Sequence, residues 1–346
     1  MGVTNVPELC MAFETDNLLY GLTRNPHDLK RSAGGSSGGE AAAIAAGLSP
    51  SGLASDACGS VRIPAHFNGI CGLKLTQGRV PLTGQFPKER SGLFHLTSAF
   101  GALGRFIDDV ELLGKILSGP DGMDPDTVEV PFYASKPLEQ MRIATCWEMD
   151  QARVVPAVAN TLTAVSAVVA PGVARIEHAQ PWGMKEAADV LWRIFITGGD
   201  SGRSWKAMFG AMGKQHYTQA LERLIAYAEE VELSVDELRR DWVMIDTFRH
   251  HLAAFFRNYD ALITPVYTDI AFEHGASMDA PEQYAFVFPF SLSGSPVVVV
   301  PAGHDRVTGM PIGIQIVGPH WHENQLFDLA RFIERTMGGW RKAPLL

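Results

Sequence analysis

Three short runs of apolar and β-branched residues near the end of the chain most narrowly limit its fold. YDALITP begins at Tyr259, SPVVVVPAG at Ser295 and PIGIQIVG at Pro311, and each run is bounded by proline or glycine. Continuous apolar runs of roughly 4–8 residues between such breakers are typical of buried strands. Together with the helical segments elsewhere in the chain, they predict an α/β fold with a central sheet.

Helix-forming segments precede and follow these strands. An alanine-rich run over Glu40–Ala46 predicts a helix that stops at Gly47. A strand-like MRIATCW is followed by a predicted helix over residues 156–170, and HENQLFDLARFIERTM predicts a final helix. Residues 183–258 carry long apolar patterns with a period near 3.6 residues. This region is therefore predicted to be a helical subdomain inserted into the fold.

Composition excludes several classes of protein. Hydrophobic residues make up 46% of the 346 residues and charged residues 19%, so disorder is not the main state. A net charge of −9 without a basic face makes nucleic acid an unexpected partner. The chain has no apolar run of about 18 residues and no signal-peptide pattern, which predicts a cytoplasmic protein without a membrane span.

The four cysteines suggest neither disulfides nor a metal site. Cys10, Cys58, Cys71 and Cys146 form no CxxC pair and have no zinc-like spacing. A reduced protein without a bound metal is therefore expected.

Two loops of small residues are the candidate chemical site. GGSSGG spans Gly34–Gly39, and DACGS spans Asp56–Ser60. Glycine and small residues allow several backbone N–H groups to point at one spot, so a serine beside them could act as a nucleophile next to an oxyanion hole. Alone, GGSSGG is more typical of a flexible link or an anion-binding turn. No GxGxxG or GK[ST] pattern accompanies it, which argues against nucleotide binding.

The two loops and their surroundings resemble the amidase signature family of serine hydrolases. The run GGSSGGEAAAIAAGLSPSGLASDACGSVRIPAHFNGICGLKLTQGRVP matches the family's order of a GGSSGG loop, a small-residue helix, a D-x-G-G-S-[IV]-R loop and a GLKPT-like stretch. Ser36 and Ser60 lie 24 residues apart, as in the family pattern. The entrance MGVTNVPEL and the three strand runs extend the resemblance over nearly the whole chain.

The resemblance implies a fold and a set of roles. The fold would be a central mixed twisted sheet flanked by helices with a helical insertion, and the reaction would be hydrolysis of a linear carboxamide without a cofactor. Ser60 would be the nucleophile, Ser36 the bridging serine after a cis peptide bond, and Ser37 would orient its loop. The oxyanion hole would be formed by backbone N–H groups of Ala57, Cys58, Gly59 and Ser60.

Two cysteines adjoin this predicted site. Cys58 stands where the family usually has a glycine or another small residue, and we interpret it as a small buried hydrophobic residue rather than a second nucleophile. If its side chain pointed into the pocket, it would narrow the acyl site. Cys10 near the entrance indicates a partly apolar substrate-binding wall.

The general base is the point at which this sequence departs from the family. The resemblance implies a buried neutral lysine several tens of residues before the stretch that matches MGVTN, and none of the nine lysines stands at that place. Lys74 lies in GLK, a position without a catalytic role in the family, and Lys30 is expected on the surface. We therefore expect the chain as given to be nearly inactive. A start further upstream, a natural remnant, or a lysine supplied by another chain would each account for the difference.

Several alternatives remain open at this level. A glutaminase resembling the A subunit of glutamyl-tRNA amidotransferase would need partner subunits and a polar pocket, and a catalytically inactive binding module would keep only the pocket. One amidase-type domain over residues 1–346 is expected, with a serine-loop core at 1–135, a substrate-side helical region at about 150–258 and closing strands and helix at 259–346. Exposed sheet would favour a homo-oligomer.

Overall fold

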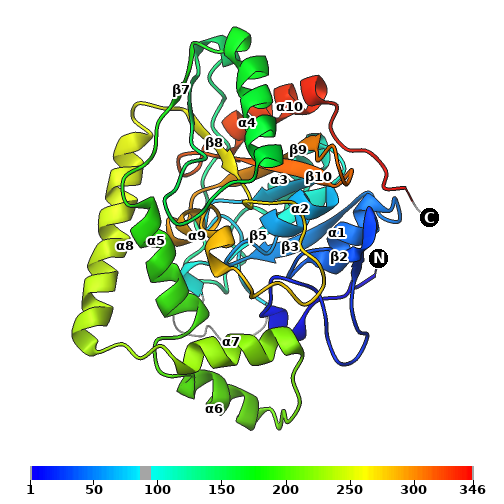
Figure 1. Cartoon of the computed structure of the whole chain (residues 1–346). Coiled ribbons are helices and arrows are strands. Elements are labelled where there is room, and N and C mark those ends of the chain that lie inside the picture. The colour runs from blue at the N-terminus through cyan, green and yellow to red at the C-terminus, as the bar shows by residue number, and fades with distance from the viewer. Residues whose placement is uncertain (1, 86–94, 345–346) are drawn as a thin grey trace.

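The computed structural model describes residues 2–85 and 95–344. In this part of the chain, a mixed sheet has the strand order β3-β5-β4-β9-β10-β8-β6-β7 (Figure 1). Most neighbouring strands are antiparallel, and only β6 pairs in parallel, with β7 and β8. The strands, in sheet order, are Ser51–Asp56 (β3), Ala99–Gly104 (β5), Cys71–Lys74 (β4), Val297–His304 (β9), Pro311–Val317 (β10), Ala261–Pro265 (β8), Arg142–Thr145 (β6) and Arg175–His178 (β7).

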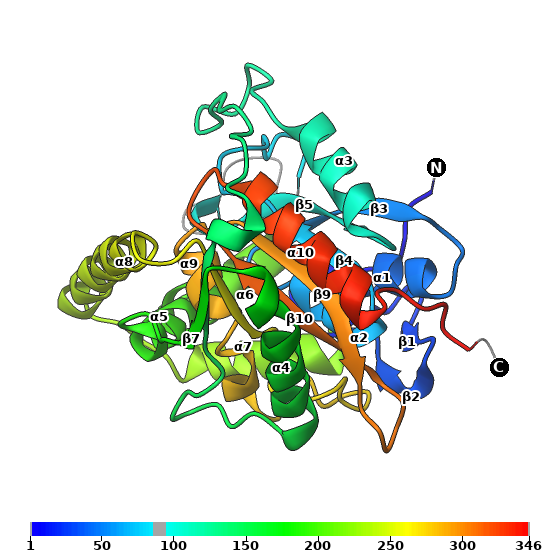
Figure 2. The same ribbon diagram turned by 90° about the horizontal axis from the view of Figure 1, so that it is seen from above.

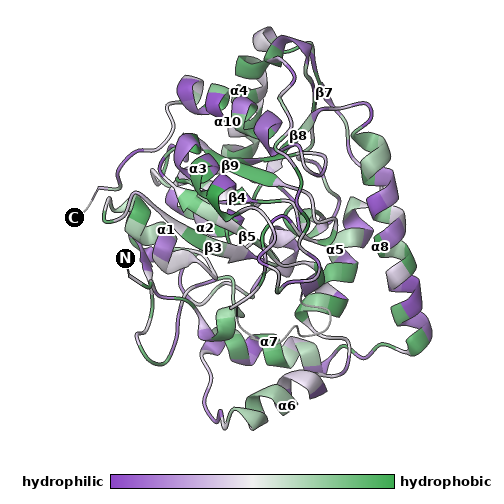
Figure 3. Ribbon diagram, turned by 180° about the vertical axis from the view of Figure 1, so that it is seen from behind, coloured by the Kyte–Doolittle hydropathy of each residue, from purple (hydrophilic) through white to green (hydrophobic). Residues whose placement is uncertain are grey.

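The central strands are buried on both faces, as their apolar runs predict. In β9, Val297 and Val299 join one buried cluster, whereas Val298 and Val300 join the cluster on the opposite face. Alternate residues of a strand point to opposite sides, so a strand that packs on both sides must be apolar throughout. Figure 3 shows this strand as a hydrophobic band between helices of mixed hydropathy.

Helices cover the two faces of the sheet. One face is packed by α3, α4 and α10, and the other by α1 and α2, with α5 and α9 beyond them (Figures 1 and 2). These helices are Ile107–Leu117 (α3), Pro156–Val169 (α4), Glu323–Met337 (α10), Gly38–Ala45 (α1), Arg62–Asn68 (α2), Met184–Leu191 (α5) and Phe288–Leu292 (α9). A short hairpin of β1 (Arg24–Asn25) and β2 (Asp28–Ser32) lies beside α1.

The predicted helical region is confirmed between β7 and β8. It contains α5, a π-helical turn at Trp192–Ile196 (η5), α6 (Arg203–Ala211), α7 (Gln219–Glu229) and α8 (Val235–Phe255). Ser234 begins α8 with a capping box, in which its side chain and that of Glu237 bond each other's backbone N–H. Figure 1 places α6 and α7 below the sheet, with the N-terminal segment close to α7.

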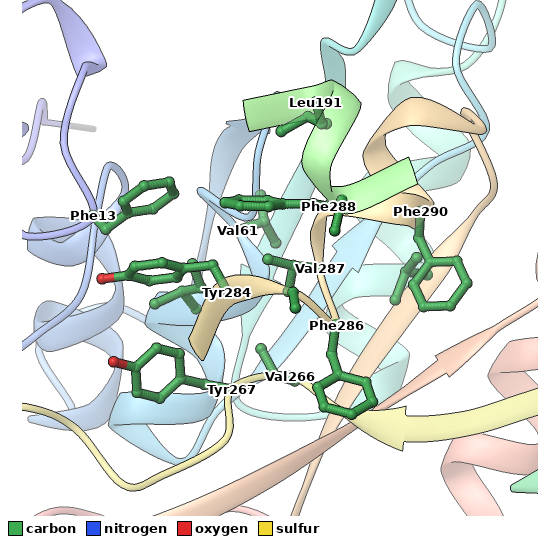
Figure 4. Packing of buried hydrophobic residues seen from close by; sticks show 14 of the residues in the cluster. Phe13, Val61, Leu191, Val266, Tyr267, Tyr284, Phe286, Val287, Phe288 and Phe290 are labelled. Atoms are coloured by element: carbon green, nitrogen blue, oxygen red, sulfur yellow. The ribbon is translucent and has the colours of Figure 1, made fainter. Parts of the chain in front are cut away.

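Buried aromatic side chains join the N-terminal segment to α9. The rings of Phe13 and Tyr284 stack with centroids 4.0 Å apart, and Phe288 packs against both (Figure 4). Aromatic contacts of this kind stabilise beyond the area that they bury, by roughly 0.5–1.5 kcal/mol each. They hold Phe13 against α9 and the 3₁₀ turn at Pro281–Tyr284 that precedes it.

The predicted helices over 40–46 and 156–170 and at the chain end are confirmed as α1, α4 and α10. Helix α2 is a difference, because RIPAHFN is a short buried segment after a loop and has no amphipathic period. All its residues are buried, so the helix has no solvent-facing polar side and its sequence shows no amphipathic pattern. No helix among the described residues is long and apolar enough to cross a membrane.

The edge strand β3 leads to a prediction about association. Among the described residues it pairs only with β5, and its Leu53 side chain is 54% exposed. An apolar edge favours pairing with a second copy. We expect light scattering to show concentration-dependent association that Leu53→Lys reduces, whereas Val307→Lys, in an exposed turn, leaves it unchanged. A wild-type chain that stays monomeric at high concentration would contradict this prediction.

Candidate active site

The loop that carries Ser60 is held by a buried carboxylate. Asp56, the last residue of β3, accepts backbone N–H bonds from Gly59 at 2.7 Å, Val61 at 3.2 Å and Arg62 at 3.3 Å. These bonds draw residues 57–61 into a tight turn between β3 and α2. Because three backbone bonds converge on one side chain, the position of Ser60 depends on Asp56.

Arg62 neutralises that carboxylate. Its Nε and Nη2 donate to the two oxygens of Asp56, each at 2.9 Å, and both side chains are fully buried. Burial by itself would raise the pKa of Asp56, but the Arg62 guanidinium outweighs it and lowers the pKa to about 2. The remaining Arg62 donors reach Val287 O at 2.7 Å and Ser291 Oγ at 2.6 Å. The pair therefore connects the serine loop to the segment that leads into α9.

The GGSSGG loop packs directly on the N-terminal segment. A Cβ at Gly35 would lie 2.6 Å from Ala12 O and 2.7 Å from Glu14 N, so only glycine fits there. The peptide bond between Gly35 and Ser36 is cis, as the resemblance implies. Thr15 Oγ1 donates to Gly34 O at 2.9 Å and accepts from Gly38 N at 3.1 Å, which ties both ends of the loop to one side chain.

The two serine loops meet through a backbone hydrogen bond. Ser37 N–H donates to Ser60 O at 3.2 Å. Ser36 and Ser37 are buried, whereas Ser60 is half-buried and borders a cavity. The structure thus brings the predicted nucleophile loop and the predicted bridging-serine loop together, although they are separated by α1 and β3 in the chain.

One of the four predicted oxyanion-hole donors, the Gly59 N–H, has a hydrogen-bond partner within the chain. It donates to Asp56 Oδ1 at 2.7 Å and so helps to hold the loop, while its predicted role toward a substrate stays a prediction. Gly59 has φ of +114°, and a Cβ there would lie 2.7 Å from Ile63 Cδ1. Within residues 2–85 and 95–344, no hydrogen bond occupies the N–H groups of Ala57, Cys58 and Ser60.

The two cysteines lie on the wall of the same cavity. Cys58 is half-buried and borders the cavity, rather than lying fully in the core. Burial, with a smaller contribution from Asp56, raises the pKa of the Cys58 thiol to about 12, so it stays protonated and weakly nucleophilic. Cys10 lies at the rim with its thiol hydrogen-bonded to Ser36, and burial of that thiol raises its pKa.

The cavity beside Ser60 has a volume of about 60 Å³. Its walls come from the N-terminal segment, the serine loop and the helical region. The lining residues are Cys10, Met11, Ala12, Phe13, Ala57, Cys58, Ser60, Phe195, Ile196, Trp205, Leu224 and Met278. The residues from the helical region were not predicted, because their apolar period indicates only a buried helix face and no particular site.

Lys74 is a buried group whose place the sequence did not reveal. It lies fully buried at the end of β4, and its Nζ donates to Ser295 O at 2.9 Å. Burial, assisted by the nearby Arg62 charge, lowers the pKa of Lys74 to about 7. Lys30 is exposed, as expected, and Lys88 lies outside the described residues.

This lowered pKa predicts a pH dependence of stability. Between about pH 7 and the usual lysine pKa, the unfolded chain binds more protons than the folded one, so the free energy of unfolding rises with pH. Each pKa unit corresponds to about 1.4 kcal/mol. We expect Lys74→Met to remove most of this rise in urea unfolding between pH 7 and 10, and Lys30→Met to leave it. Parallel curves for wild type and Lys74→Met would contradict the assignment.

Comparison with known proteins identifies the family. Residues 1–327 match the family model for Amidase, and the chain belongs to this family. It is 28% identical to fatty-acid amide hydrolase 2 of Homo sapiens, over 98% of this chain and 67% of that protein. It is 31% identical to indoleacetamide hydrolase of Bradyrhizobium diazoefficiens, over 98% of this chain and 65% of that protein. The chain thus spans about two thirds of the length of these relatives.

A solved structure confirms the fold. The A subunit of glutamyl-tRNA(Gln) amidotransferase from Thermotoga maritima superposes with a TM-score of 0.82 and 25% identity, covering 100% of this chain and 76% of that one. The predicted α/β fold, with a mixed central sheet flanked by helices, is therefore confirmed.

Proposed function

We propose that this protein hydrolyses carboxamides with Ser60 as the nucleophile. The observation that carries the proposal is the placement of Ser60 at the wall of a cavity, on a turn held by Asp56 and bonded to the GGSSGG loop. Membership of the Amidase family supports the class of reaction. The two relatives are likewise named for amide substrates, a fatty-acid amide and indoleacetamide.

In the proposed reaction, Ser60 Oγ attacks the amide carbonyl carbon, and the C=O π electrons move onto oxygen. Backbone N–H groups of Ala57, Cys58 and Ser60 would stabilise that oxyanion, since they have no other partner within residues 2–85 and 95–344. Collapse of the intermediate breaks the C–N bond, and Ser36 relays the proton lost by the Ser60 hydroxyl to the nitrogen of the leaving amine. Water then hydrolyses the acyl-enzyme and regenerates Ser60.

The proton acceptor for Ser60 limits the rate in this proposal. In the part of the chain that the structure describes, no side chain accepts a hydrogen bond from the Ser60 hydroxyl, and Lys74 donates to Ser295 O. Acid–base catalysis contributes about 10²–10⁴-fold in enzymes. We therefore propose that residues 1–346 by themselves turn over amides slowly.

Two measurements test the proposal. Ammonia release from simple primary amides should be slow but above the buffer rate, and a fluorophosphonate probe should label Ser60 slowly, as located by peptide mass spectrometry. Labelling at another serine, or no Ser60-dependent ammonia release, would refute Ser60 as the nucleophile. Turnover at the level of a typical relative would instead refute the proposed slow turnover.

A further inference from the structure

We infer that the cavity beside Ser60 selects a short, uncharged acyl or aryl group, and that the substrate is the amide of a small apolar acid rather than of an amino acid such as glutamine. This inference rests on the proposed function, because it assigns the cavity to the acyl side of the substrate. It is carried by the composition of the cavity walls, by the pairing of two carboxylates beside them and by the small volume of the cavity.

Three separate parts of the chain build the apolar walls. The π-helical turn η5 contributes Phe195 and Ile196, while α6 and α7 contribute Trp205 and Leu224. A π-helical turn shifts the side chains that follow it relative to a regular helix, and such turns occur frequently at functional sites. Here the turn places two consecutive apolar side chains at the cavity that Ser60 also borders.

The opposite wall is equally uncharged. It consists of residues 10–13 together with Ala57 and Cys58, and Ser60 supplies the hydroxyl. None of the twelve lining residues is an acid, a base or a histidine, and the pKa of the Cys58 thiol is raised to about 12. A substrate group in this cavity would therefore meet carbon, sulfur, backbone, the Ser60 hydroxyl and the Trp205 indole ring, with no counter-ion.

The two glutamates that flank residues 10–13 in the chain, Glu8 and Glu14, already have hydrogen-bond partners. Glu8 accepts from Lys214 Nζ at 2.5 Å and from Thr218 N at 2.8 Å. Glu14 accepts from Ser277 Oγ at 2.6 Å and from Gly275 N at 2.9 Å. Binding the ammonium and carboxylate of glutamine would either break these bonds or bury unpaired charges, and both are costly.

The small volume of the cavity favours a small acyl group. About 60 Å³ is far below the roughly 300–1,000 Å³ of pockets that enclose drug-sized ligands. Leu224 in α7 and Cys58 in the serine loop bound this space. A short branched chain or a single flat ring fits such a volume better than a long fatty chain.

Binding can be measured separately from turnover with the Ser60→Ala variant, in which no substrate is consumed. We would titrate this variant with isobutyramide, benzamide, decanamide and glutamine and measure binding by calorimetry. Isobutyramide and benzamide should show saturable binding. We expect affinity for glutamine and decanamide to be at least about tenfold weaker, since each unmatched group costs a factor of that order or more. Tighter binding of glutamine or decanamide would overturn the inference.

Enlarging the cavity provides the second arm of the test. Leu224→Ala should shift the preference towards longer amides by about tenfold, because removed side-chain volume becomes available to the ligand. Ile225→Ala is the matched control, since Ile225 is a half-buried neighbour on α7 that does not line the cavity. An unchanged chain-length profile in Leu224→Ala, with both variants folded by circular dichroism, would overturn the placement of the acyl group.

The outcomes separate this inference from the proposed function. Binding of small apolar amides to the wild-type chain without any Ser60-dependent hydrolysis would leave the pocket assignment intact and refute the reaction. Ser60-dependent hydrolysis that prefers glutamine would keep the reaction and refute the pocket assignment.

Discussion

Replacing Ser60 with alanine is expected to abolish fluorophosphonate labelling and to reduce ammonia release from simple amides to the buffer rate. Removing the nucleophile costs about 10⁶-fold in a serine hydrolase that has its base in place. Since no side chain in the described part of the chain accepts a hydrogen bond from the Ser60 hydroxyl, the expected loss is smaller, at least about 10²-fold. Ammonia release and labelling are measured on the same preparations.

A matched serine controls for the substitution itself. Ser166 lies on α4 with its hydroxyl bonded to Leu162 O of its own helix. Ser166→Ala should therefore retain both labelling and ammonia release. Activity that survives Ser60→Ala, in a chain with unchanged circular dichroism, would rule out Ser60 as the attacking group.

Replacing Asp56 with asparagine is expected to destabilise the fold and disorder the serine loop together. The substitution leaves Arg62 buried without its counter-ion, and breaking one partner of a buried ion pair costs about 3–5 kcal/mol. It also weakens the bonds from Gly59, Val61 and Arg62 N–H that hold Ser60 in place. Urea unfolding should show the loss of stability, and labelling of Ser60 should slow in the fraction that remains folded.

The Asp56–Arg62 pair also predicts behaviour in acid. The pKa of Asp56 is lowered to about 2 in the folded chain, so its contribution to stability is full above its usual pKa near 3.8 and is lost as the pH falls through about 2. Asp56→Asn should therefore lose less stability than the wild type between pH 5 and 2.

Two further variants separate the buried pair from a general charge effect. Asp189→Asn removes an exposed carboxylate that pairs with Lys185, and it should change stability by less than about 1 kcal/mol. Arg62→Lys keeps the positive charge but loses the two-point contact with Asp56, so a loss of stability between those of the other two variants is expected. If Asp56→Asn were as stable as Asp189→Asn, the assigned role of the pair would be wrong.

Local signals predicted the parts of the fold that depend on neighbouring residues in the chain. The apolar runs at 259–265, 295–303 and 311–318 became β8, β9 and β10, since a strand buried on both faces shows its burial in its own composition. Helix α4 was also predicted within a residue of its bounds. Helix α2 was not, because all its residues are buried and no amphipathic pattern marks it.

The candidate site divides in the same way. GGSSGG and DACGS are short motifs, so the amino-acid sequence alone points to Ser36, Ser37 and Ser60, with roles implied by the family resemblance. The occupation of the Gly59 N–H by Asp56 could not be predicted, because it depends on how the turn folds back over its own strand.

By itself, the sequence determined which residues are proposed to carry the chemistry, because they lie in two short motifs. It also determined that a buried sheet is present, because apolar composition marks the strands. Only the tertiary structure decided that Arg62 closes the Asp56 turn, that Lys74 is buried, and that η5, α6 and α7 wall the cavity beside Ser60. These features bring together residues that are far apart in the chain, or they depend on how a turn of the backbone orients a side chain. Their burial and charge pairing exist only once the chain has packed.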